Sequence, residues 1–157
     1  MAISLWGCGP GTDPTPDACA IAGDPVVELG VPDPITFLDY ADVGAAGRIP
    51  VSSNGQTFLA VQLALRGQNL GDRVQVGLRV RSDATGATTE LRVADAPVER
   101  FRCRDDGFRY LVPVVVTTEG LGDEAMLQDT PVTADVTVLD QDGRMATASV
   151  SGVLERL

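Results

Sequence analysis

Four arginines crowd one short stretch of the chain and are the residues best suited to bind an anion. They are Arg100, Arg102, Arg104 and Arg109. Guanidinium groups form charge-assisted hydrogen bonds with carboxylates and phosphates, so the cluster could contact an anionic ligand or partner. Alternation of charged and apolar residues is, however, more often the solvated face of a strand, and Asp105 and Asp106 lie nearby to neutralise it.

A second stretch, Leu-Asp-Gln-Asp-Gly-Arg at 139–144, has part of the pattern of a calcium-binding loop. An EF-hand loop beginning at Asp140 would need a bidentate glutamate at its twelfth position, where this chain has Ser151. The surrounding residues also alternate as strands do. We therefore expect a hairpin turn at Asp142 and Gly143, and no metal site.

The first of the three cysteines, Cys8, follows Leu5, Trp6 and Gly7. An apolar residue, a variable one, a small one and then cysteine is the order that resembles the lipobox of bacterial lipoproteins, in which the cysteine receives the lipid. The residues that follow are rich in glycine and proline, as a flexible tether would be. The resemblance implies a lipid anchor at Cys8, with 1–7 the remnant of a removed signal.

The other two cysteines are Cys19 and Cys103. If lipid occupies Cys8, these two remain as one pair, which would form a disulfide in an oxidising compartment. The alternative is a buried Cys103 that acts as a small apolar residue, with a free thiol at Cys19. Of the two, we predict the disulfide between Cys19 and Cys103.

Composition excludes several classes of function. The chain has no histidine, which removes Ser-His-Asp and Cys-His catalysis and histidine-bound metals. A formal net charge of -10 would repel nucleic acid. No apolar stretch approaches the roughly eighteen residues of a membrane helix. We therefore expect no enzyme, no cofactor and no nucleic-acid partner.

Residues 26–157 alternate between apolar and polar, with turn residues between the alternating segments. The clearest segments are 57–67, in which Leu59, Val61, Leu63 and Leu65 share one side, and 73–82, where valines and Leu78 alternate with Gln75 and arginines. Further strands are predicted within 26–30, 35–40, 88–93, 98–103, 108–118, 131–140 and 145–157, and a brief edge segment is predicted within 48–56, with a turn at Asn54-Gly55. Pro113 predicts a bulge or an edge position in its strand.

About seven to nine short strands without a long helix predict an all-β fold. We expect an antiparallel immunoglobulin-like β-sandwich at 26–157, preceded by a disordered, flexible tether at 8–25. A jelly roll or a small barrel is the alternative topology, because strand number alone does not decide between them.

The order of these segments, including the Asn-Gly-Gln turn before 57–67 and the late Val-Leu-Asp-Gln-Asp-Gly-Arg hairpin, resembles a loosely defined group of uncharacterised lipoproteins from high-GC bacteria. The resemblance implies an exported lipoprotein with an immunoglobulin-like domain, and it implies no catalytic residues.

The expected function is therefore a non-catalytic interaction or structural module of the cell envelope, with an envelope protein as its partner. The chain would be held by lipid at the outer membrane or the periplasmic face, or else be secreted. The alternative is a ligand-binding module, for instance for glycans, although the few aromatic residues offer little to stack on a sugar ring.

Overall fold

A computed structural model describes residues 18–45, 47–53, 58–96 and 101–157, except for the side chains of 94 and 95. In that part of the chain the fold is all-β, as predicted, and the single helical element is the 3₁₀ turn η1 (Glu124–Met126). The strands are β1 (Val26–Pro32), β2 (Tyr40–Ala41), β3 (Arg48–Ser52), β4 (Ala60–Gln68), β5 (Val74–Ser82), β6 (Thr88–Ala96), β7 (Arg102–Cys103), β8 (Arg109–Thr117), β9 (Pro131–Asp140) and β10 (Met145–Arg156).

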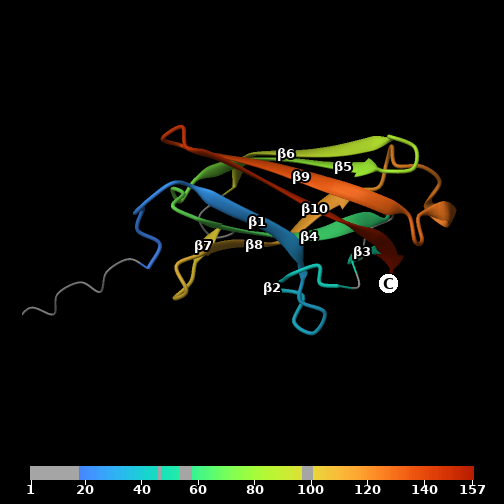
Figure 1. Cartoon of the computed structure of the whole chain (residues 1–157), viewed down its shortest axis with the longest axis horizontal. Coiled ribbons are helices and arrows are strands. Elements are labelled where there is room, and N and C mark those ends of the chain that lie inside the picture. Colours follow the sequence, from blue (N-terminus) through green and yellow to red (C-terminus); the bar gives the residue numbers. More distant parts are fainter. Residues whose placement is uncertain (1–17, 46, 54–57, 97–100) are drawn as a thin grey trace, which may run out of the picture.

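The strands form one continuous sheet that folds over into two layers (Figure 1). One layer has the order β1-β4-β8-β7, and the other has the order β6-β5-β9-β10. Strand β3 joins them, because it pairs with β4 in the first layer and with β10 in the second.

The pairing of β3 with β10 is parallel, so the expectation of a purely antiparallel sheet was wrong. The remaining pairs are antiparallel. The parallel contact joins an early strand to the last one, so no hairpin connects the pair. A hairpin, in contrast, forces its neighbouring strands to be antiparallel.

Strand β4 is the centre of its layer. It pairs with β8 along one edge and with β1 and β3 along the other, and six consecutive residues from Ala60 to Leu65 are buried. The apolar residues of β5 and β9 alternate into the same core, while Gln75, Arg79 and Arg81 are exposed. This is the one-sided burial that period-two alternation indicates.

Two local predictions had different outcomes. The pairing of β4 with β8 shifts register between Leu63 and Leu65, opposite the segment that contains Pro113, so the predicted bulge is confirmed. The strand predicted at 35–40 is wrong: apart from Tyr40, these residues form a loop between β1 and β2. The loop forms because the Asp33 carboxylate binds its backbone N–H groups, as described below.

Candidate functional site

The predicted disulfide between Cys19 and Cys103 is confirmed, with 5.8 Å between the two Cα atoms. It joins the segment before β1 to the short strand β7. The Cys19 residue is 5% exposed, and the Ala18 carbonyl lies close to Gly107 in the turn between β7 and β8. The bond therefore fixes two segments that are 84 residues apart in the sequence.

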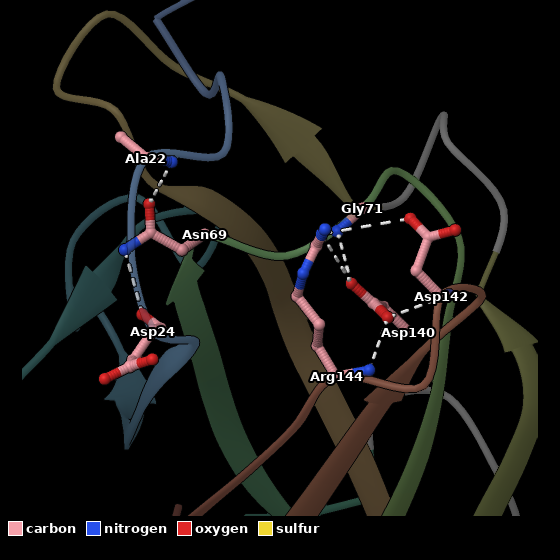
Figure 2. Close-up of polar contacts among 7 residues, drawn as sticks. All are labelled: Ala22, Asp24, Asn69, Gly71, Asp140, Asp142 and Arg144. Atoms are coloured by element: carbon pink, nitrogen blue, oxygen red, sulfur yellow. Dashed lines mark hydrogen bonds and ion pairs between the residues drawn. The ribbon is translucent and has the colours of Figure 1, made fainter.

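Asn69 holds the same segment at a second point. The Ala22 N–H donates to its Oδ1 atom at 3.1 Å, and its Nδ2 atom donates to the Asp24 carbonyl at 2.9 Å (Figure 2). Asn69 has a φ angle of 56°, a left-handed conformation that asparagine tolerates better than most residues. Residues 18–25 thus contact the domain, and the tether prediction otherwise concerns residues 8–17, which lie outside the described part.

Arg104, the residue after Cys103, connects the disulfide to the loop between β1 and β2. Its Nη1 atom lies 2.5 Å from an Asp39 carboxylate oxygen, and its Nη2 atom donates to the Leu38 carbonyl at 3.3 Å. Its guanidinium also stacks on the ring of Tyr110, 4.2 Å from the centroid. Arg104 therefore binds both the side chain and the backbone of this loop.

Asp33 organises the beginning of the loop. Its Oδ1 atom accepts hydrogen bonds from the N–H groups of Ile35 and Thr36, both at 2.9 Å, and its backbone pairs with Asp39 and Phe37. The N–H donors of Thr36 and Ile35 hold the pKa of the Asp33 carboxyl below its ordinary value. Such side-chain bonding to the backbone competes with strand formation, which is why an apolar stretch closes into a loop.

The loop presents three large apolar side chains to solvent, and we call these the apolar tip: Ile35 is 85% exposed, Leu38 67% and Phe37 54%. Phe37 also has a φ angle of 56°, which for a bulky residue costs on the order of 1–3 kcal/mol. Adjacent exposed apolar residues on an ordered loop are typical of contact surfaces. Sequence reasoning missed the site because it assigned Ile35, Phe37 and Leu38 to a strand.

Arg66 forms a second cluster beside this loop. Its guanidinium lies between two aromatic rings, 4.3 Å from the Tyr40 centroid and 4.7 Å from the Phe108 centroid, and it forms an ion pair with Glu28. Burial, with help from Asp42, raises the pKa of Tyr40 to about 12. The stack fixes β2, the end of the loop, against the outer face of β4.

The predicted arginine cluster is divided between different surroundings. Arg100 lies outside the described residues, and Arg104 is bound by Asp39. Arg102 pairs with Tyr110 and Cys103 with Arg109, so Arg102 and Arg109 are on opposite faces of the β7–β8 pair. Arg102 and Arg104 both lie at Tyr110, whereas Arg109 is on the other face, and an anion or partner contact here stays a prediction.

The hairpin turn predicted at Asp142 and Gly143 is confirmed: it connects β9 to β10, and the side chain of Asp140 stabilises it. Its buried carboxylate accepts hydrogen bonds from the N–H groups of Gly71 at 3.1 Å, Asp142 at 2.9 Å and Arg144 at 2.8 Å (Figure 2). Burial acts to raise the pKa of this carboxyl, but the three donors outweigh it and leave the pKa below its ordinary value. Asp140 thus ties the β4–β5 loop to the β9–β10 hairpin, a structural role.

The outer face of β6, β5 and β9 has a shallow hollow of about 590 Å³. Its polar lining comes from Gln75, Arg79, Glu90, Arg92, Asp135 and Thr137, and Gly77 leaves space in the middle strand. No aromatic residue is among the residues that line it. The hollow could accept a polar ligand, but it offers no ring for stacking.

The described ranges hold neither a cluster of metal ligands nor a membrane-spanning helix. No group of three Cys, Asp or Glu side chains gathers there as metal ligands would. No helix in this part of the chain has the length and apolarity needed to cross a membrane. Cys8, the predicted lipid site, precedes residue 18 and lies outside the described residues.

Comparisons with protein-family models, with curated proteins and with solved structures found no match to this chain. The resemblance to lipoproteins of high-GC bacteria therefore stays a prediction.

The role of Asp140 gives a prediction on pH dependence. Because its pKa is lower in the folded than in the unfolded chain, its stabilising effect is present above the unfolded pKa of about 3.9 and is lost as the pH falls through the folded pKa. We expect Asp140→Asn to lower the free energy of unfolding at pH 7 by about 1–3 kcal/mol, since an NH₂ group would face N–H donors. Urea denaturation at pH 7 and at pH 2–3 measures both values.

The difference between wild type and Asp140→Asn should shrink as the pH falls, because the stabilising effect of the carboxylate declines below the unfolded pKa and is lost once the pH passes through the folded pKa. Asp142→Asn is the matched control: that carboxylate is 55% exposed, and we expect a change within about 0.5 kcal/mol. A difference for Asp140→Asn that stays constant across this range would contradict the assignment.

Proposed function

We propose that this protein is a non-catalytic interaction module of the bacterial cell envelope, anchored by lipid at Cys8, and that it binds its protein partner through the apolar tip. The Cys19–Cys103 disulfide supports export, because disulfides persist in oxidising compartments and are rare in the cytosol. Residues 26–157 number 132, which is the size of one domain, and its loops can carry the contact.

An immunoglobulin-like sandwich is the fold that we propose within the all-β class. The order β1-β4-β8-β7 corresponds to the ABED sheet of that fold, and β6-β5-β9-β10 corresponds to its C′CFG sheet. The cysteine pair differs from that of antibody domains, since it joins the segment before β1 to β7 instead of strands B and F. Many cell-surface domains use this architecture for binding.

The apolar tip is the observation that carries the proposal. Ile35, Phe37 and Leu38 remain exposed although the loop is held at both ends, by Asp33 and by Arg104. A loop that is already ordered loses little conformational entropy on binding, so its apolar area contributes more fully to affinity. Anchoring aromatic and aliphatic side chains of this kind commonly dominate the energy of protein interfaces.

A ligand-binding module is the second candidate, and the hollow over β6, β5 and β9 is the observation in its favour. Its polar lining could hydrogen bond a sugar, but its lack of aromatic residues weakens this candidate against the apolar tip.

The lipid anchor predicts where the protein is found. Expressed from its native gene in its own host, it should partition into the detergent phase of a detergent–water separation, whereas Cys8→Ala should partition into water because an acyl anchor contributes about 0.8 kcal/mol per buried methylene. Thr12→Ala, in the same stretch, is the control and should behave as wild type. Equal partitioning of wild type and Cys8→Ala would overturn the anchor.

The contact site can be tested in the same cells by photocrosslinking. A photoreactive amino acid in place of Ile35 should give an adduct with one discrete envelope protein, whereas the same group in place of Thr85, in the exposed β5–β6 turn, should not. Arg104→Ala should reduce the yield at position 35 several-fold, because it releases the loop from its ion pair. Identical adduct patterns at both positions, or no adduct at position 35, would contradict the proposal.

A further inference from the structure

Strand β6 is the edge strand of its layer, at one end of the sheet (Figure 1). Within the described residues it pairs with β5 on one side, and its other edge continues into no further strand. The N–H and C=O groups along such an edge are a template for another strand, and natural proteins usually block them.

A row of alternating charges crosses the outer face and ends at this edge. Asp135 of β9 stands directly opposite Arg79 of β5, which stands directly opposite Glu90 of β6. The Arg79 Nε atom lies 2.8 Å from a Glu90 carboxylate oxygen. The next position in the row, beyond β6, would suit a positive charge.

The next row on the outer face, which contains Gly77 and Arg92, would instead suit a negative charge beyond β6. Arg92 of β6 is exposed and stands opposite Gly77, which has no side chain, so nothing on β5 balances its charge. The position beyond Arg92 would therefore suit a negative charge. One strand that carries a cation and an anion two residues apart would satisfy both rows, and β6 itself is such a strand.

The regular part of the edge is short. The β5–β6 register shifts between Val74 and Val76, beyond Val93 on the β6 side. At the other end, Gly120 lies so close to Thr88 that a Cβ atom on it would be 2.8 Å from the Thr88 carbonyl oxygen. The regular part of the edge is therefore 89–93, with Leu91 at its centre and with Glu90 and Arg92 exposed.

We propose that two copies of this chain pair through their β6 edges, antiparallel, about a two-fold axis through Leu91. In that register Glu90 stands opposite Arg92 of the second copy, and Arg92 opposite its Glu90. Both ion pairs lie on the outer face, and both charge rows continue across the dimer. On the inner face the two Leu91 side chains, each only partly buried in the single chain, would contact each other.

The charges also disfavour the adjacent registers. If the register shifts but inner faces still meet inner faces, the two-fold axis passes through Glu90 or through Arg92. In the first case the two Glu90 side chains are directly opposite each other, and in the second case the two Arg92 side chains are. The symmetric contact closes at two copies, so it forms a dimer and not a fibre.

The test is sedimentation of the full chain, with Cys8→Ser to prevent intermolecular disulfides, over a range of concentrations at low ionic strength. We expect a reversible dimer that weakens with added salt. Glu90→Arg and Arg92→Glu should each raise the dissociation constant about tenfold or more, because each variant places like charges opposite one another twice. Thermal unfolding of each variant checks that the domain is still folded.

Mixing the two variants gives the decisive result. Glu90→Arg has two cations at these positions and Arg92→Glu has two anions, so an equimolar mixture should form heterodimers, and the double variant should again form homodimers. Arg81→Glu, on the outer face of β5, is the control for a changed net charge and should dimerise as wild type. A wild type that stays monomeric, or a mixture that does not associate, would overturn the proposal.

Discussion

The covalent bond between Cys19 and Cys103 is the constraint on which the arrangement of the proposed contact surface depends. Strand β7 has two residues and, within the described part of the chain, pairs with β8. The disulfide holds it in place, and the next residue, Arg104, then reaches across to Asp39 and the Leu38 carbonyl. The apolar tip is thus positioned by a bond to a segment that is distant in the sequence.

The two outer faces of the folded sheet differ in physical character. Over β4, the outer face is covered by β2 and by Arg66, whose guanidinium stacks between the rings of Tyr40 and Phe108. The attraction in this stack depends on the aromatic rings as well as on the charge of the arginine. Over β5 and β6, the outer face is exposed and carries rows of alternating charges, with a hollow at Gly77. The first face supports the loop between β1 and β2, whereas the second ends at the edge strand β6.

The fold class could be predicted because long strands with one wet face leave a period-two pattern, as β5 and β9 do with their alternating valines. The disulfide could be predicted by counting cysteines. The parallel β3–β10 pair could not, because the local sequence contains no information on which distant strands meet. The loop at 33–39 was mistaken for a strand because Ile35, Phe37 and Leu38 have strand-forming side chains, while the deciding group is the Asp33 carboxylate. The Arg66 cluster was missed because its partners come from three separate segments.

Hydrogen exchange of the loop amides tests most directly whether the disulfide orders the apolar tip. The measurement compares the oxidised wild type with Cys19→Ser/Cys103→Ser and follows the amides of Thr36 and Phe37, with those of β4 as the reference for the folded domain. We expect exchange in the loop to be at least about tenfold faster in the variant under conditions where β4 stays protected, because Arg104 is no longer held against Asp39. Equal exchange of the loop amides in both proteins would contradict the account.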